Sequence, residues 1–520
     1  MSAHSRHRKS ARRKRRIGKR LAPRAWPDQP RPMFGARNIH YDVADRLRAT
    51  GVGGIGAMHL LAQRVGLVRR IDEHLHLLKR HLPYHESDHV LNIGYNLLAG
   101  GDCLEDLELL RQDEAYLDAL GAQRIPDPTT EGDFCRRLTH SDIETLQWVF
   151  NITRVDVWRE HARHEPGFFD EARLDADGSM AETSGQCKQG MDINHKNQWG
   201  YHPLLVSLAN TREPLFLDNR PGNRPSYEGA AHRLDQAVAL CREAGFRSML
   251  LRGDTDFTQT THLDRWDAQG DVGFIFGVDA MPNLVAIAEN IEDNRWQRLH
   301  RPPAYTTRSD PPVRRARPVN VKEQVVVQRE FKNLRLQSED VAEFDYRPGA
   351  CKKTYRIVVV RKNLSVEKGE QLLFDDIRYF FYLTNDRATD AEGIVFLAND
   401  RCEQENLIEQ LQNGCKAMRM PADNLLSNWA YMVMAALAWT LKAWFALLMP
   451  VTRGRWAERH RDERHELLRM EFKRFVNAMM RLPCQVLRTG RKLVYRLLSW
   501  NRWQAALLRA AEAWRRPMHC

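Results

Sequence analysis

The sequence predicts an α/β core set between helical regions, on three observations. Short apolar runs with polar borders, which are typical of strands, recur between residues 172 and 278. One amphipathic helix, expected over 227–245, separates the third run from the fourth, so the core begins as an antiparallel meander and continues as an α/β unit. Residues 319–385 then alternate in a β manner without a convincing helix, which predicts a mainly β insertion. The expected strands are Ala172–Asp177, Pro203–Leu208, Pro214–Asp218, Ser248–Arg252, Gly273–Val278, Val319–Val327, Thr354–Val360 and Tyr379–Leu383.

The flanking regions differ from this core in pattern. The first 35 residues are rich in Arg and then in Pro, a composition that predicts a disordered arm. Amphipathic helical faces, such as the one from Met58 to Val68, recur from about Gly56 to Asp170. Helices are expected again from about Asp390 to the end of the chain.

Two features bear on compartment. The nine cysteines are scattered and form no CxxC pair, which favours a reducing cytosol, and no apolar stretch follows the basic N-terminus as in a secretory signal. The apolar run Trp429–Leu441 ends at Lys442 and is shorter than the ~20 residues of a membrane span. We therefore expect a buried core helix there and no membrane association.

The net charge of +12 is unevenly distributed along the 520 residues. Residues 1–24 hold eleven Lys or Arg and no acid, and residues 451–520 hold seventeen Lys or Arg against six acids. The middle of the chain therefore carries a net charge of −10. Two basic ends around an acidic centre favour binding of a polyanion at the ends, with a merely solubilising tail as the alternative.

Acidic residues follow two of the expected strands. Asp175 and Asp177 end the first strand, and Asp254 and Asp256 follow the strand that ends at Arg252. Carboxylates held at strand ends can bind divalent cations, and a pair of such cations can activate water in phosphoryl transfer. An Asp-Gly turn and helix caps are the alternative interpretations.

A third acidic segment lies in a later helix. Arg401, Glu405 and Glu409 recur at four-residue spacing, so they share one helical side, and a glutamate there can complete a three-carboxylate site. A solvated charged face is the alternative. The segment His85–His89 matches HExxH, the zinc-protease pattern, but Ser87 and Asp88 are good N-caps, so the two histidines are expected to straddle a helix start.

Together these segments resemble the DDE transposases of bacterial insertion sequences, of the transposase DDE domain group 1 type, over about residues 50–450. The first-Asp and second-Asp motifs of that family are similar to Leu174–Ser179 and Arg252–Phe257, and Arg401 with Glu405 resembles its Tyr-Arg-Glu-Lys signature. Flanking similarity is found at Leu97–Leu107, Leu110–Asp113, Asp127–Thr130, Phe134, Gly200–Leu205 and Arg220–Asn223.

The resemblance implies a ribonuclease-H-like catalytic core with a mainly β insertion, a helical N-terminal domain and a helical C-terminal region. It implies that Asp177, Asp254 and Glu405 are the catalytic residues and hold two Mg²⁺ ions, for which Mn²⁺ can substitute. The implied domains are a basic disordered arm (1–35), a helical DNA-binding domain (36–166), the first part of the core (167–285), the β insertion (286–378), the second part of the core with the glutamate helix (379–450) and a basic helical region (451–520).

The implied function is a DNA transposase that binds the terminal inverted repeats of its element, cleaves there and joins the ends to target DNA. The expected assembly is a homodimer or a larger synaptic complex, in the bacterial cytoplasm near the nucleoid. Arg401 and Lys416 are expected to bind DNA beside the site, and the basic arm is expected to bind phosphates through Arg12, Arg13, Lys14, Arg15 and Arg16.

The chain departs from the family signature at two positions. Ala398 stands where the signature has Tyr and Gln412 where it has Lys, and Lys416, one turn later, is the candidate substitute for that Lys. Two alternatives to a transposase therefore stay open: a ribonuclease-H-like nuclease that cuts without joining, and an inactive derivative that only binds DNA.

Overall fold

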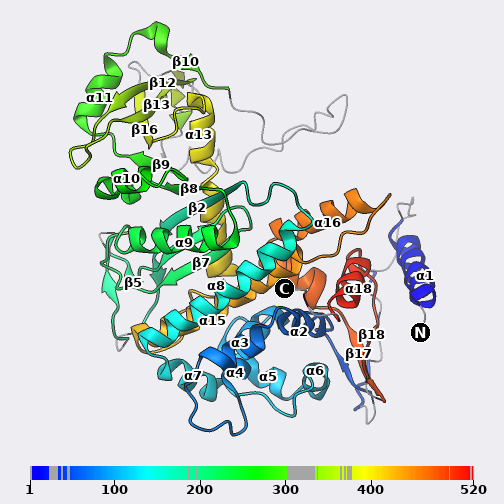
Figure 1. Ribbon diagram of the computed structural model, residues 1–520. Coiled ribbons are helices and arrows are strands. Elements are labelled where there is room, and N and C mark those ends of the chain that lie inside the picture. Colours follow the sequence, from blue (N-terminus) through cyan, green and yellow to red (C-terminus); the bar gives the residue numbers. More distant parts are fainter. Residues whose placement is uncertain are drawn as a thin grey trace.

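A nine-stranded mixed β-sheet dominates one half of the molecule, and helices make up most of the other half (Figure 1). The computed structural model describes residues 3–22, 33–34, 36, 39–43, 47–185, 188–194, 196–300, 334–335, 338–363, 366–367, 370–371, 377–490, 492–515 and 518. The strand order in this sheet is β10-β12-β13-β16-β9-β8-β2-β6-β7.

The five strands expected between residues 172 and 278 are all present. Strand β2 pairs antiparallel with β6 on one side and parallel with β8 on the other, and β8 pairs parallel with β9. Since parallel strands end at the same edge, the segments that follow β2 and β8 lie side by side. The bounds are β2 Glu171–Gly178, β6 Leu204–Leu208, β7 Glu213–Asp218, β8 Ser248–Gly253 and β9 Val272–Val278.

The strands of the expected β insertion extend this same sheet. Strand β16 (Ile377–Thr384) pairs antiparallel with β9, and β13 (Tyr355–Asn363) and β12 (Ser338–Tyr346) continue the sheet outward, with β10 (Gln297–Arg298) at its edge. The expected strand Val319–Val327 lies outside the described residues. Small three-stranded sheets form from β11 (Leu334–Arg335), β14 (Val366–Glu367) and β15 (Glu370–Gln371), and from β3 (Ala181–Glu182), β4 (Asp192–Ile193) and β5 (Trp199–Tyr201).

Helices cover both faces of the large sheet. Helix α9 (Ala230–Ala244), within the range predicted for it, packs against β2, β6, β7 and β8, and α10 (Thr260–Asp267) against β9. Helix α13 (Ala391–Asn399) packs against β9, β12, β13 and β16, and α14 (Cys402–Glu409) against β2. Buried residues lie on both faces of β8, since Leu251 joins the main core and Leu250 packs in the smaller cluster with Ile394 of α13.

The helical part is built around one buried helix. Helix α15 (Leu425–Leu447) is long and apolar enough to cross a membrane, yet it is buried inside the protein against α4, α7, α8 and β7, as expected for a core helix. Figure 1 shows α15 running beside α8 through the middle of the molecule. Around it lie α2 (Ile55–Arg64), α3 (Leu67–His74), α4 (Glu86–Ala99), α5 (Leu107–Arg111), α6 (Glu114–Leu120), α7 (Pro128–Arg137) and α8 (His140–Ala162), and α11 (Pro282–Glu289) lies at the sheet.

The C-terminal region is not purely helical, which corrects the sequence prediction. A hairpin of β17 (Cys484–Thr489) and β18 (Lys492–Leu497) interrupts it, and β1 (Ala49–Thr50) completes a small sheet with β17. Gly490, at φ +55°, supplies the left-handed residue that the tight turn needs. The helices of this region are α16 (Ala457–Arg469), α17 (Phe472–Phe475) and α18 (Gln504–Ala513).

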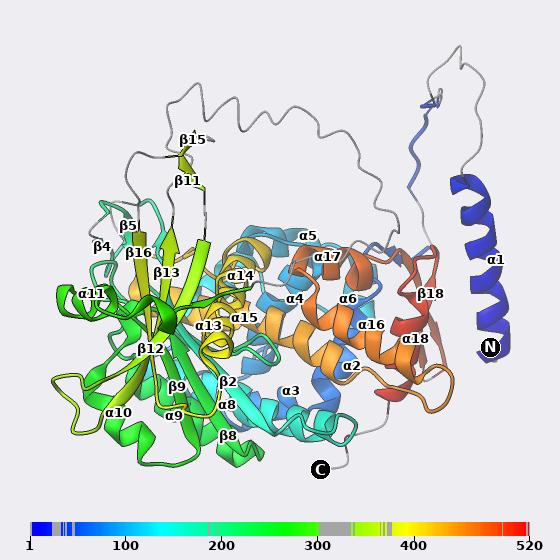
Figure 2. The same cartoon turned by 90° about the horizontal axis from the view of Figure 1, so that it is seen from above.

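The basic arm is also corrected, because residues Ala3–Leu21 form helix α1 instead of a disordered segment. Ala, Arg and Lys are good helix formers, and this stretch contains no proline. Arg6 forms an ion pair with Glu512, and the Arg13 guanidinium donates to the Leu497 carbonyl at 2.6 Å. Figure 2 shows α1 beside β18 and α18 at one end of the molecule.

Candidate active site

Asp177 and Asp254 come together because β2 and β8 are parallel neighbours. Asp177 is the last residue but one of β2, paired with Leu205 of β6, and Asp254 directly follows β8. Asp254 also caps the short helical turn Thr255–Phe257 by accepting a hydrogen bond from the Asp256 amide, so one predicted alternative, a helix cap, is present as well.

Arg401 approaches these two acids from the start of helix α14, which packs on β2. It caps the start of α14, and its Nη1 atom donates to Asp177 Oδ2 at 3.1 Å, with 16% and 13% of the two side chains exposed. Burial alone would lower the pKa of Arg401, but the carboxylates of Asp177, Asp254, Asp175 and Glu405 raise it above its ordinary value. Arg401 is therefore the cation at the centre of this acidic site.

The two aspartates repel each other through a partly buried space. Burial raises the pKa of Asp177 to about 6, Arg401 opposes this shift, and the charge of Asp254 adds to it. Burial likewise raises the pKa of Asp254, which Arg401 opposes and which Asp256 and Asp279 reinforce. Both carboxylates are harder to ionise than usual, and a bound cation would stabilise their ionised forms.

Glu405 lies one turn along α14 from Arg401, on an exposed face of the helix. The helix is fixed to the sheet by Gln404, whose side-chain oxygen accepts from the Ser207 hydroxyl and whose amide contacts the carbonyls of Asp175 and Leu205 at 3.4 Å. Gln404 is buried, so its hydrogen bonds set the distance between the glutamate helix and β2.

Gln412, which replaces the Lys of the family signature, and Lys416, its candidate substitute, have different environments in the structure. The Gln412 amide donates to Ser179 Oγ at 2.9 Å and to the Met180 carbonyl at 3.3 Å, so this side chain holds the end of β2. Lys416 follows the π-helical turn Gln410–Gly414 in a left-handed backbone conformation, φ +54°. Within the described part of the chain, no hydrogen bond or ion pair joins Lys416 to the three acids.

Asp175, two residues before Asp177 on the same strand face, has a different environment. Arg252 binds its carboxylate through two hydrogen bonds of 2.6 and 2.9 Å, and both side chains are 1% exposed. The remaining Arg252 donor reaches the Leu397 carbonyl of α13 at 2.8 Å. Asp175 is therefore a structural group that joins β2, β8 and α13.

The donor set at the strand ends fits Mg²⁺ in chemistry, because carboxylate oxygens are its preferred protein ligands. Among the described residues, the three acids do not form a group whose ligand atoms lie within 4.8 Å of one another. Asp177 and Asp254 with Glu405 are the residues that would hold Mg²⁺.

The HExxH segment does not form a protease site. Helix α4 begins at Glu86 with His85 as its N-cap, earlier than the Ser87 or Asp88 cap that the sequence suggested. His89 is buried one turn into the helix, where its Nδ1 lies 3.1 Å from Glu131 and its ring stacks on Phe134. His85 lies at the N-cap and His89 inside the helix, so the two histidines straddle the helix start as the sequence predicted.

Comparison with known proteins defines the class. Residues 38–516 match the family described as transposase DDE domain group 1, and the chain therefore belongs to this family of DDE transposases, whose function is DNA transposition. A solved structure of a piggyBac transposase synaptic complex with hairpin DNA aligns with 83% of this chain and 82% of its own, at 9% identity and a TM-score of 0.37. No curated protein matches the sequence. Membership thus depends on the family match alone.

Proposed function

We propose that the protein is a metal-dependent transposase that cleaves DNA at the ends of an insertion sequence and joins those ends to target DNA. One observation carries the proposal: inside the family-matched region, Asp177 and Asp254 meet at the ends of adjacent parallel strands, with Arg401 and Glu405 beside them on one helix. Asp177, Asp254 and Glu405 would hold two Mg²⁺ ions, for which Mn²⁺ can substitute.

A ribonuclease-H-like core is part of the same proposal. Supporting it, strands β7, β6 and β2 run antiparallel to one another and β8 and β9 continue parallel to β2, with helices on both faces. In this arrangement each proposed ligand has rigid support, because Asp177 and Asp254 belong to strand ends and Glu405 to a helix fixed by Gln404.

The proposed chemistry assigns separate tasks to the side chains. When bound, a pair of Mg²⁺ ions supplies an activated nucleophile and neutralises charge on the oxygens of an in-line displacement. Arg401 is hydrogen-bonded to Asp177 in the free protein, and the proposal gives its guanidinium the task of binding a DNA phosphate once Asp177 serves as a ligand. No covalent protein intermediate is needed, since positioning and electrostatics suffice.

Substitution of each acid tests the assignment. Asp177→Ala, Asp254→Ala and Glu405→Ala should each abolish Mg²⁺-dependent cleavage and joining of element ends, whereas Glu409→Ala, an exposed acid on the same helix, should not. Retained activity in any of the three would remove that residue from the site. Cleavage without joining by the intact protein would favour a nuclease, and DNA binding without cleavage would favour an inactive derivative.

DNA binding outside the site is proposed for the basic ends. Helix α1 exposes Arg12, Lys14, Arg15 and Arg16, with the Lys14 ammonium 5.8 Å from the centre of the Trp500 ring, so the arm and the basic C-terminal region form one surface. Such a surface binds phosphates without reading sequence.

Deletion of residues 1–24 should weaken DNA binding and flatten its dependence on salt, by about 0.9 in log–log slope for each phosphate that the protein no longer neutralises. Metal-dependent cleavage at saturating DNA should remain. The measurement is the binding constant for an element end over a range of salt concentrations, and an unchanged slope would show that α1 does not bind DNA.

The proposed partners are the terminal inverted repeats and target DNA, and the proposed assembly is a homodimer or larger synaptic complex in the bacterial cytoplasm, near the nucleoid. Both ends of an element must be cut together, which favours at least two copies. The mass of the complex formed with paired element ends tests this assembly, and a complex with one copy per pair of ends would contradict it.

A further inference from the structure

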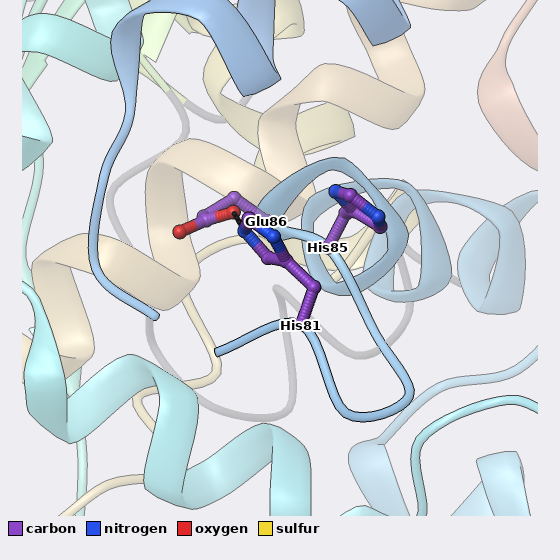
Figure 3. A group of neighbouring side chains, drawn as sticks. All are labelled: His81, His85 and Glu86. Carbon is purple, nitrogen blue, oxygen red and sulfur yellow. Dashed lines mark hydrogen bonds and ion pairs between the residues drawn. The ribbon is translucent and has the colours of Figure 1, made fainter. Parts of the chain in front are cut away.

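Three side chains that could bind a metal meet in the helical half of the molecule, away from the proposed active site. The segment between α3 and α4 turns back on itself, so that His81 approaches His85 and Glu86 at the start of α4 (Figure 3). One ligand atom from each of the three residues lies within 4.8 Å of the others.

Glu86 is the fixed member of this group. Its side chain is buried, and its Oε1 atom accepts hydrogen bonds from the amides of Leu77 and Leu78 at 2.9 and 2.8 Å. These two hydrogen bonds hold the carboxylate in place, and its Oε2 atom lies 3.1 Å from His81 Nε2.

The two histidines are the exposed members. His81 Nε2 lies 3.1 Å from Glu86 Oε2, the contact drawn as a dashed line in Figure 3, and the His81 and His85 rings stack at 4.0 Å with 13° between their planes. An exposed pair of imidazoles beside a fixed carboxylate is a donor set that binds transition metals in preference to Mg²⁺.

We propose that His81, His85 and Glu86 form a site for a divalent transition metal, with Zn²⁺ as the ion that their chemistry suits best. Ligand atoms of a tetrahedral zinc site lie about 3.3 Å apart, given Zn–N and Zn–O bonds of about 2.0–2.1 Å. Metal binding would therefore require the two exposed imidazoles to leave their stacked arrangement and turn their ring nitrogens toward a common point beside Glu86. Water completes the fourth position.

The role of this site is structural. Glu86 is the ligand that is already fixed, and His89, the second histidine of HExxH, is buried against Glu131 and cannot join it. The bound ion would tie residues 77–86 into one unit, because Glu86 already holds the amides of Leu77 and Leu78 and the ion adds His81 and His85. The site shares no residue with the carboxylates at the strand ends, so it is independent of the proposed transposase chemistry.

Zinc titration of the tag-free, full-length protein tests the proposal. In millimolar Mg²⁺, which occupies carboxylate-only sites, calorimetry with ZnCl₂ should show one saturable site per chain and a raised thermal midpoint. His81→Ala and His85→Ala should each weaken Zn²⁺ binding by at least about 10-fold, the lower bound seen when even a supporting residue of a metal site is removed.

The matched control is His76→Ala, an exposed histidine of the same segment outside the cluster, which should bind Zn²⁺ as the unaltered protein does. His81 and His85 are exposed, but His85 is also the N-cap of α4, so circular dichroism in chelator checks that each substitution leaves the metal-free fold intact. Equal Zn²⁺ binding by all three variants, or no saturable binding by the unaltered protein, would overturn the proposal.

Discussion

Asp175 and Asp177 lie two residues apart on strand β2, and each pairs with an arginine, but the two pairs differ in burial and in the number of hydrogen bonds. Arg252 closes both oxygens of Asp175, and each side chain is 1% exposed. Arg401 reaches one oxygen of Asp177, and the two side chains are 13–16% exposed. The same residue types therefore form a fully buried structural pair, the closed pair Asp175–Arg252, and a partly exposed pair, the open pair Asp177–Arg401.

The difference lies in what surrounds each carboxylate. Asp175 is buried beneath α13, Arg252 binds both of its oxygens, and a further Arg252 donor reaches the Leu397 carbonyl, so the carboxylate is closed off from solvent. Asp177 lies at the strand end, where Asp254 adds a second negative charge and α14 presents Arg401. A buried bidentate pair thus marks structure, and an incompletely satisfied pair at a strand end marks a site.

The largest expected effect is a loss of cleavage rate when Asp177 of the open pair is replaced. Asp177→Asn should lower Mg²⁺-dependent cleavage by roughly 1,000-fold or more, since a metal contributes several kcal/mol of charge stabilisation. Its folding stability should be unchanged or higher, because Asn removes a charge that burial and, to a smaller extent, Asp254 disfavour by more than the ion pair with Arg401 offsets. Cleavage rate and urea unfolding measure both quantities, and a large loss of stability would show that the pair is a structural joint.

The closed pair should respond in the opposite way. Arg252→Met leaves the buried Asp175 charge unpaired and should destabilise the fold by about 3–5 kcal/mol. The double variant Asp175→Leu, Arg252→Met should recover much of that stability, since it removes both charges together. Urea unfolding of the two variants decides the point, and a single variant as stable as the parent would contradict the structural role.

Acid unfolding sharpens the comparison, because neither pair should be its cause. The folded-state pKa values of Asp175 and Asp177 are raised, so protonation does not disfavour the folded state at these residues. His161 has the opposite sign: burial lowers its pKa to about 4, so its contribution to stability is present above pH 6.5 and is lost as pH falls toward 4, by up to about 3 kcal/mol. His161→Gln should flatten the dependence of unfolding free energy on pH in this window, and an unchanged slope would exclude His161.

The smallest effect is expected at Gln412, which holds the end of β2 beside Asp177. Gln412→Ala removes its hydrogen bonds to Ser179 and Met180 and should cost about 1 kcal/mol of stability. A modest fall in cleavage rate should accompany it if the strand end positions Asp177. Gln412→Lys, which restores the family residue, tests whether a cation is preferred there, and a faster cleavage rate in this variant would show that it is.

Local pattern was enough to predict the centre of the fold. The apolar runs that became β2, β6, β7, β8 and β9 are short and bordered by turn residues, and the two aspartates at their ends follow from strand direction alone. Gln404 was missed, because a buried glutamine that joins a helix to two strands has no sequence signature.

The prediction of a disordered arm was wrong although Ala, Arg and Lys favour a helix locally, and only the contact of α1 with Glu512, nearly the whole chain away, could not be read from the local sequence. The strand β16 was predicted, but its pairing with β9 crosses a long intervening segment and so was not predictable locally. The C-terminal hairpin did carry a local signal, Thr489-Gly490 between alternating residues, which the charge of the region obscured. The histidine cluster was missed because His85 was compared with His89 along the helix and not with His81 across the loop.

The return of the chain beside β9 has a consequence for how such proteins can vary. After Val278 the chain adds β10, β12 and β13 to the outer part of the same sheet, and β16 then pairs with β9 before the chain enters α13 and α14. Helix α13, which precedes the glutamate helix, packs on β9 and β16 and also on β12 and β13, whereas α14 itself packs on β2. Variation in length is therefore easiest to accommodate at the outer edge of the sheet, beyond β12, while β12 and β13 are constrained by their contacts with α13.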